Sequence, residues 1–398
     1  MRRQWLACIV TLALGMHAAA FAGEGPVKIG VLGDSSSVYA NIGGKGSIEA
    51  VKMAVEDAGP VLGSPVEVIS ADHQNKADVG SNIARRWFDE DGVDVIADLP
   101  NSAVALAVIQ VARDKHKIAF TGAGSSDITG QYCSPYSAQW VYDSYALGKV
   151  LGTSVTKSGG DSWFFNTVDY TFGHALERDT SEFVKAAGGK VLGSVRAPIN
   201  TSDFSSFLLQ AQASGAKVIA FANTGNDTVN AVKQGREFGM SAGGAQQFVA
   251  LNAFFSDVAG MGLANGQRVM LGAPFYWDQD DQTRAWSKRF EERVGHKPTA
   301  IQAGAYSEVS HYLKAVKAAG TKDADKVMAK MREIPINDFM THNGKLRIDG
   351  RVERDMYLFE VKTPAESKGP NDLYKLIARI PGDQATRPLS EGGCPLVK

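Results

Sequence analysis

The chain has 398 residues, with 42 basic and 43 acidic side chains, a formal net charge of −1 and 44% hydrophobic residues. It contains no long run of like charge, so the sequence indicates neither a nucleic acid nor an anionic membrane surface as a partner. Beyond the first residues, no segment approaches the roughly 20 consecutive apolar residues that a membrane span needs. The length is sufficient for two lobes, each with its own core.

The first 22 residues have the layout of a cleavable export signal. Arg2 and Arg3 give a positive start, the stretch Trp5–Met16 is apolar, and small residues at Ala20 and Ala22 end the segment. We therefore expect cleavage after Ala22 and a mature protein that is exported from the cytoplasm.

Short apolar strands then alternate with helical patterns, which is typical of a parallel sheet with helices on both faces. A first group of predicted strands comprises Val27–Leu32, Val66–Ile69, Val93–Ala97 and Ile118–Phe120. The alternation pauses near Gln139–Tyr145 and restarts with a second group at Trp163–Phe165, Lys190–Val195, Val218–Ala222 and Gln247–Leu251. The sequence therefore predicts an α/β fold with two sheets and no flexible linker between them.

The C-terminal third departs from this alternation. Helices are predicted within Thr283–Met331, and late strands at Leu346–Ile348 and Met356–Val361. The segment 381–398 is rich in proline and glycine, so we expect an extended strap there.

Ligands of open parallel sheets bind beyond the carboxyl ends of the strands. Three predicted strands are followed by the segments Gly33–Ala40, Asp98–Ala103 and Thr121–Ser126, and two of these segments are small, hydroxyl-rich turns. Free backbone N–H groups and serine hydroxyls in such turns suit a carboxylate. Helix capping alone, by Asn101 and Ser102, is the alternative, and the sequence leaves both open.

Signals for an enzyme are weak. Ser35 follows the first strand as in GDSL-type hydrolases, but the chain lacks the Asp-x-x-His that these hydrolases need. Gly122-Ala123-Gly124 lacks the third glycine of a dinucleotide site, and Lys45 is not followed by Ser or Thr as a P-loop requires. The histidines show no metal-ligand spacing. We expect no catalytic residue, no cofactor and no metal.

Two cysteines, Cys133 and Cys394, remain after loss of the signal, which carries Cys8. An even number of cysteines in an oxidising compartment indicates one disulfide. Two buried thiols are the alternative.

Several stretches together resemble the solute-binding proteins of branched-chain amino-acid-type ABC importers, the leucine/isoleucine/valine-binding family. They occur in the family's order: Lys28–Leu32, Gly46–Asp57, Ala71–Gln74, Pro100–Ala103, Asp169–Gly173, Asp203-Phe204 and Pro298–Ala318. The resemblance is nearest to a branch that binds aromatic or other small carboxylates. It implies a type I periplasmic binding protein with three hinge crossings. Lobe 1 would comprise 24–141 and 277–342, and lobe 2 would comprise 142–276 and 343–380.

The resemblance also implies which residues contact the ligand. The carboxylate would be held by Ser102-Ala103 and Gly124-Ser125, and further contacts would come from Tyr39, Tyr170, Phe172 and Thr224. The implied partners are a small-molecule carboxylate and an ABC permease with its ATPase, and we expect a monomer. A sensing role, in which the closed form engages a signalling receptor, is an alternative.

One departure from the family's pattern bears on the ligand. Amino-acid receptors of this family hold the ligand's ammonium with an acidic residue, but the corresponding position here is Asn252. A buried ammonium without a counter-charge costs several kcal/mol. We therefore expect an aromatic acid to bind in preference to a branched-chain amino acid such as leucine. The alternative is a shift of the alignment that would let Asp257 supply the charge.

Overall fold

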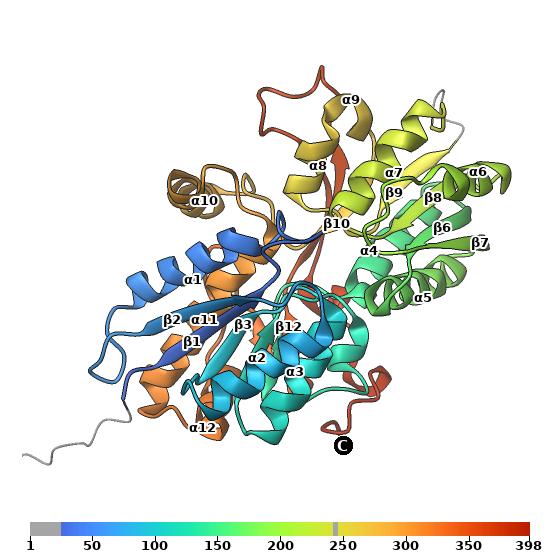
Figure 1. Ribbon diagram of the computed structural model, residues 1–398. Helices are drawn as coiled ribbons and strands as arrows, with labels where there is room; N and C mark the ends of the chain where they lie inside the picture. Colours follow the sequence, from blue (N-terminus) through green and yellow to red (C-terminus); the bar gives the residue numbers. More distant parts are fainter. Residues whose placement is uncertain (1–24, 242–245) are drawn as a thin grey trace, which may run out of the picture.

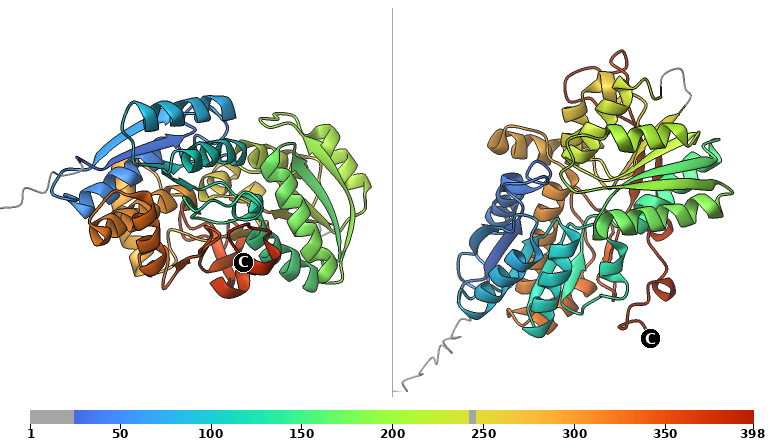
Figure 2. Two further views of the ribbon diagram at one scale, coloured as in Figure 1. Left: turned by 90° about the horizontal axis from the view of Figure 1, so that it is seen from below. Right: turned by 45° about the vertical axis from the view of Figure 1, so that its right-hand side comes forward.

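The computed structural model describes residues 25–241 and 246–398, so the predicted export signal lies outside the described residues. Figure 1 shows two α/β lobes, one formed by blue, cyan and orange segments and the other mainly by green and yellow segments. Figure 2 shows that the lobes lie side by side. Within the described ranges, no helix combines the length and apolarity that crossing a bilayer requires. The predicted two-lobed α/β fold is confirmed.

The first sheet is parallel throughout, in the spatial order β2 (Glu67–Asp72), β1 (Lys28–Gly33), β3 (Val95–Asp98), β4 (Ile118–Thr121) and β5 (Ser137–Gln139). Side chains alternate across it: Val31 packs with one helix layer and Leu32 with the other. The first layer contains α1 (Gly44–Ala58) and α11 (Ala300–Ala319), and the second contains α2 (Ala77–Asp89) and α3 (Ser102–Asp114). The carboxyl ends of β1, β3 and β4 therefore meet at one edge of the lobe.

The second sheet has the order β14 (Tyr374–Ile380), β13 (Met356–Val361), β10 (Met270–Ala273), β9 (Gln247–Ala250), β8 (Val218–Ala222), β6 (Ser162–Val168) and β7 (Lys190–Ala197). Only the pairs made by β13 and β14 are antiparallel among those described for this sheet. One face packs against α4 (Ser144–Lys157) and α5 (Thr171–Ala186). The other packs against α6 (Ser205–Ala213), α7 (Asn226–Glu237) and α8 (Phe255–Met261).

The remaining helices and strands follow these sheets in the chain. The short helix α9 (Leu263–Gly266) precedes β10, while α10 (Asp281–Val294) and α12 (Ala324–Glu333) flank α11. β11 (Lys345–Leu346) and β12 (Val352–Glu353) form a two-stranded ladder. Arg351 beside this ladder pairs with Gln139 at the end of β5, so the ladder contacts the first lobe.

The chain passes between the lobes at three places: between β5 and α4, between β10 and α10, and between β12 and β13. Two buried arginines connect these crossings. Arg351 donates to the Asp143 carboxylate at 2.6 Å and to the Gln139 carbonyl at 3.2 Å, which joins the third crossing to the first. Arg354 donates to the carbonyls of Pro274 and Met340, which joins the third crossing to the second.

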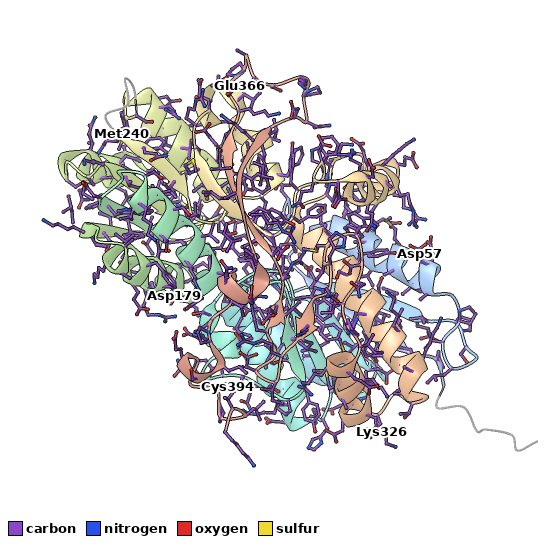
Figure 3. All side chains as sticks on the ribbon, turned by 180° about the vertical axis from the view of Figure 1, so that it is seen from behind. Asp57, Asp179, Met240, Lys326, Glu366 and Cys394 are labelled. Atoms are coloured by element: carbon purple, nitrogen blue, oxygen red, sulfur yellow. A yellow bond between two sulfur atoms is a disulfide. The ribbon has the colours of Figure 1, made fainter. Side chains whose placement is uncertain are left out.

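The C-terminal strap contains two short helical turns, α13 (Gly382–Ala385) and η3 (Leu389–Glu391). It ends against the first lobe, where Cys394 forms a disulfide with Cys133, 261 residues earlier in the chain (Figure 3). The predicted pairing of the two cysteines is confirmed.

Asp98 is a buried carboxyl at the end of β3, with φ of 81°. Its Oδ1 accepts from the Ser47 hydroxyl at 3.1 Å, and its Oδ2 has no partner in the described part of the chain. Its backbone N–H donates to Glu308. Burial raises the pKa of the Asp98 carboxyl to about 7, from an ordinary value of 3.8.

This pKa predicts a pH-dependent stability. Between about pH 4 and pH 7 the folded state binds more protons than the unfolded state, so stability falls as the pH rises through this window. Asn tolerates a positive φ and cannot ionise. We expect Asp98→Asn to be more stable than the wild type at pH 8 by about 4 kcal/mol, because the rise of the pKa from 3.8 to about 7 costs about 1.4 kcal/mol per pKa unit once both states are ionised.

Urea unfolding at pH 8 and pH 4.5 measures the effect. The difference between variant and wild type should shrink at the lower pH, while the exposed control Asp383→Asn should show no such trend. If the variant and the wild type differ in unfolding free energy by the same amount at both pH values, ionisation of the buried Asp98 carboxyl does not destabilise the fold.

Candidate ligand-binding site

The loop after β1 is organised by Asp34. Its carboxylate accepts hydrogen bonds from the Ser37 hydroxyl at 2.6 Å, from the Tyr39 N–H at 2.9 Å and from the Asn75 side chain at 2.8 Å. These bonds hold Tyr39 over the edge of the first lobe, where its hydroxyl is hydrogen-bonded to the hydroxyl of Tyr170 in the second lobe. Tyr39 is consequently buried, with 2% of its surface exposed.

A second contact between the lobes lies beside the first. Gly225, the residue before α7, has φ of 64°, and a Cβ at this position would be 2.9 Å from the Val38 carbonyl oxygen. Glycine therefore allows the turn before α7 to approach the loop after β1. The two lobes are in contact along this edge, so a ligand would enter only after they separate.

Helix α3 begins at Ser102, and Asn101 is its N-terminal cap. The Asn101 side chain accepts from the N–H groups of Ala103 at 2.9 Å and Val104 at 3.1 Å. The Ser102 hydroxyl accepts from the Ser125 N–H at 3.2 Å. The N–H groups of Ala103 and Ser125 are thus already bonded within the lobe. Because the Ser102 oxygen accepts this hydrogen bond, the hydroxyl proton of Ser102 can still be donated to another group.

Gly124 lies between aromatic side chains. A Cβ there would be 2.4 Å from the Tyr142 ring and 2.6 Å from the Phe172 ring, so the position admits no side chain. The Tyr142 and Phe172 rings meet edge to face, with centroids 6.5 Å apart. Tyr170 lies beside Phe172, with ring centroids 6.4 Å apart. The turn from the first lobe and these aromatic residues therefore form one surface.

Asn252 follows β9 and joins the same group. Its side-chain amide donates to the Tyr142 hydroxyl at 3.0 Å, and both residues are buried. A cavity of about 10 Å³ lies beside Asn252, and Phe254 and Tyr276 also line it. Thr224, after β8, is buried with a hydroxyl that has no partner within the described residues. The structure thus brings Asn252, Tyr142 and Phe172 together, with Thr224 nearby in the same lobe.

Two acidic residues lie on the second-lobe side. Asp257 accepts from the N–H groups of Phe254 at 3.0 Å and Gly225 at 3.2 Å, and burial raises its pKa to about 6. The Oδ2 atom of Asp227 accepts from the Asn200 N–H at 3.1 Å, whereas its buried Oδ1 has no partner within the described residues. Burial raises the pKa of Asp227 to about 6 as well.

The roles of Tyr142 and Asp227 were not predicted from the sequence. Tyr142 lies in the first crossing, close in sequence to the aromatic residues Trp140 and Tyr145, and this local group of aromatic residues is the signal that could have identified it. Trp140 and Phe275, by contrast, pack inside the protein: Trp140 donates to Ser307 at 2.8 Å, and Phe275 lies against Phe339. Asp227 carried no signal beyond its place in the first turn of α7.

A family model described as periplasmic binding protein matches residues 26–370. A periplasmic binding protein from Burkholderia mallei is 48% identical, with a TM-score of 0.91, and the match covers 94% of this chain and 99% of that one.

Two further relatives are similar over most of their length. A branched chain amino acid ABC transporter periplasmic ligand-binding protein from Burkholderia xenovorans LB400 is 43% identical, with a TM-score of 0.84, over 94% of this chain and 100% of that one. The Leu/Ile/Val-binding protein homolog 6 of Brucella melitensis biotype 1 is 24% identical over 89% of this chain and 92% of its own. These relatives are binding proteins rather than hydrolases. The chain belongs to the periplasmic binding protein family.

Proposed function

We propose that this protein is the extracytoplasmic receptor of an ABC importer, capturing a small carboxylate, preferably an aromatic acid, between its two lobes. The observation that carries the proposal is the hydrogen bond that the neutral Asn252 side chain donates to the Tyr142 hydroxyl. This bond lies in the contact region between the lobes, which comprises Tyr39, Ser102, Gly124, Tyr142, Tyr170, Phe172 and Asn252. Contacts from both lobes make the closed state bind better than the open state, so a ligand shifts the population towards closure.

The direction of the hydrogen bonds favours an anion. The Ser102 oxygen accepts from Ser125, and the Tyr142 oxygen accepts from Asn252. Each hydroxyl can therefore donate its own proton towards a ligand carboxylate. The rings of Phe172 and Tyr170 offer apolar faces to an aromatic body, and such ring pairs add about 0.5–1.5 kcal/mol beyond burial.

The residues around Asn252 offer little stabilisation to a ligand ammonium. Asn252 is neutral, and the Asp257 carboxylate is occupied by the N–H groups of Phe254 and Gly225. The proposal therefore favours an acid without an amino group. Of the residues predicted to contact the ligand, Ser102, Gly124, Phe172 and Asn252 support the proposal through the contacts described above.

A branched-chain amino acid is the second candidate ligand, and one observation favours it. The unpartnered Oδ1 of Asp227 is a buried acceptor, and its charge acts on the hydroxyls of Tyr39 and Tyr170. A ligand ammonium near this oxygen would find a counter-charge. In that case Asp227→Asn would weaken leucine binding, and the aromatic acid would be the poorer ligand.

The remaining parts of the account are also proposals. Lobe 1 comprises 24–141 and 277–353, lobe 2 comprises 142–276 and 354–380, and 381–398 is a strap. The boundary that the resemblance implied at 343 moves to 354 in this proposal, because the β11–β12 ladder contacts the first lobe. The protein acts as a monomer in the periplasm and delivers its ligand to a permease driven by an ATPase. A signalling receptor in place of the permease would use the same closure. Deletion of the partner permease that leaves the cell's response to ligand intact would favour that role.

A thermal-shift screen of refolded, ligand-free protein tests the proposed ligand class. Benzoate, phenylacetate, leucine and the neutral benzamide are compared at equal concentration. A ligand present at 100 times its dissociation constant stabilises the folded state by about 2.7 kcal/mol. We expect an aromatic acid to raise the melting temperature while benzamide does not. If no carboxylate stabilises the protein, the proposal is wrong.

Ser102→Ala tests the donor role of the hydroxyl. Loss of a hydrogen bond to a charged group costs roughly 1.5–3 kcal/mol, so the dissociation constant of the aromatic acid should rise at least about tenfold. Calorimetric titration measures this change, and the melting temperature of the free variant serves as the control for stability. An unchanged dissociation constant in a destabilised variant would show that the hydroxyl only supports Ser125.

A further inference from the structure

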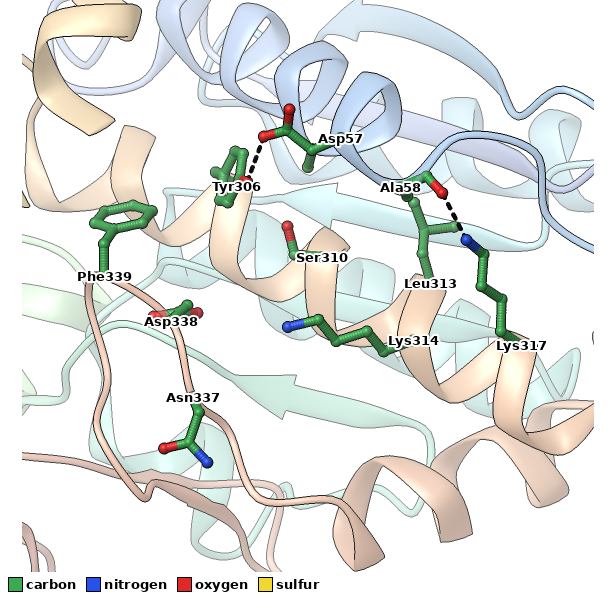
Figure 4. A pocket seen from close by; sticks show the side chains of 11 residues that line it. Asp57, Ala58, Tyr306, Ser310, Leu313, Lys314, Lys317, Asn337, Asp338 and Phe339 are labelled. Atoms are coloured by element: carbon green, nitrogen blue, oxygen red, sulfur yellow. Dashed lines mark hydrogen bonds between the residues drawn. The ribbon is translucent and has the colours of Figure 1, made fainter. Parts of the chain in front are cut away.

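A second hollow of about 420 Å³ lies on the first lobe, between the last turns of α1 and the middle of α11. The buried apolar side chains of Ala54 and Leu313 form part of its lining. Tyr306 and Ser310 also line it, and the segment Asn337–Phe339 lies at one end (Figure 4). None of these residues belongs to the contact region between the lobes. The hollow is therefore a separate feature.

Some charged side chains around the hollow have hydrogen-bond partners, and Lys314 has none among the described residues. Asp57 is bonded to Arg289 and to the Tyr306 hydroxyl, and Lys317 donates to the Ala58 carbonyl. Lys314 has no hydrogen bond or ion pair within the ranges that the structure describes. Figure 4 shows its ammonium pointing into the hollow, between Ser310 and Asp338. The hollow thus combines an unpaired cation with hydroxyls and an apolar lining.

The segment that closes the hollow also contacts the hinge. Asp338 accepts from the Ser307 hydroxyl, which in turn accepts from the Trp140 indole N–H beside the first crossing. The Phe339 ring lies against Phe275 of the second crossing, with centroids 6.0 Å apart. The Met340 carbonyl accepts from Arg354 of the third crossing. A conformational change in this segment would therefore alter contacts with all three crossings.

We propose that this hollow binds a small organic anion, with its acidic group at Lys314 and its apolar body against Leu313 and Phe339, and that occupancy alters lobe closure. Asp338 also lines the hollow, but its carboxylate accepts hydrogen bonds from the Ser307 hydroxyl and from the N–H groups of Met340 and Thr341. Charge complementarity selects the occupant, because Lys314 is the charged group of the described lining that has no hydrogen bond of its own. An effector bound here acts on closure from outside the contact region between the lobes.

The probe for binding is 8-anilino-1-naphthalenesulfonate, an anion with an aromatic body whose fluorescence rises in apolar sites. We expect Lys314→Glu to weaken its binding by about tenfold or more. Ser310→Phe, which fills the hollow without changing charge, should have the same effect. The control is Lys326→Glu on α12, an exposed lysine far from Asp57 and the hollow (Figure 3), and it should leave binding unchanged.

Competition then tests the need for an anion. 2-Naphthoate should displace the probe from the wild type, and the neutral 2-naphthamide should not. Equal displacement by both, or equal weakening by Lys314→Glu and Lys326→Glu, would overturn the proposed site. The link to closure is read from small-angle scattering: the probe should change the radius of gyration of the wild type but not of Lys314→Glu. Binding that depends on Lys314 without any such change would overturn the link.

Discussion

Replacing Cys133 and Cys394 by serine is expected to lower the free energy of unfolding by up to about 5 kcal/mol. The disulfide closes a loop across 261 residues, and the chain-entropy model assigns its largest stabilisation to loops of this length. At an unfolding entropy of about 2.1 cal/mol/K per residue, the melting temperature should fall by about 6 °C. Differential scanning calorimetry of the variant and the wild type measures the effect.

The strap gives this prediction a structural control. Arg387 of the strap donates to the Ser126 carbonyl at 2.9 Å, so contacts other than the disulfide also hold the strap to the first lobe. Arg387→Ala in the oxidised protein should therefore cost less than loss of the disulfide. Equal melting temperatures for oxidised and fully reduced wild type would contradict the role of the disulfide.

Replacing Arg351 by methionine is expected to destabilise the protein by about 3–5 kcal/mol. Arg351 and Asp143 are both nearly inaccessible, at 1% and 3% side-chain exposure, and removal of one partner leaves the other as an uncompensated buried charge. The Gln139 carbonyl would also lose its donor. Guanidinium unfolding monitored by circular dichroism gives the change in free energy.

The double variant Arg351→Met/Asp143→Asn separates charge from packing. Asparagine can still cap α4, as the Asp143 carboxylate does by accepting from the Ala146 N–H at 2.7 Å. If the buried charge dominates, the double variant should be more stable than Arg351→Met alone. A double variant as unstable as the sum of the two single variants would show that the pair does not act as a unit.

Much of the fold could be predicted because buried strands such as β1 and β8 are continuous apolar runs. Three strands were missed for physical reasons, and one of them, β12, has only two residues. β5 is only three residues long, and Ser137 and Gln139 are polar, so no apolar pattern marks it. β14 is an edge strand with exposed Leu376 and Ile377, and its sequence does not separate inward from outward positions.

The candidate site could be located only in part. The turns holding Ser102 and Gly124 follow predicted strands, so the edge of the sheet indicated them. The bond between Tyr39 and Tyr170 depends on how the lobes close, and no local pattern encodes it. One partner of Asp257, the Gly225 N–H, likewise lies 32 residues earlier in the chain, and only the structure identifies it.

The measurement that tests the central claim most directly is isothermal titration calorimetry of benzoate and leucine on the wild type and Asn252→Asp. We expect the wild type to bind benzoate more tightly than leucine, because Asn252 supplies no charge for an ammonium. The aspartate should weaken benzoate binding by adding a like charge beside Tyr142. Tight leucine binding by the wild type without a response to benzoate would contradict this account and assign the ammonium partner to another residue, with Asp227 first to be tested.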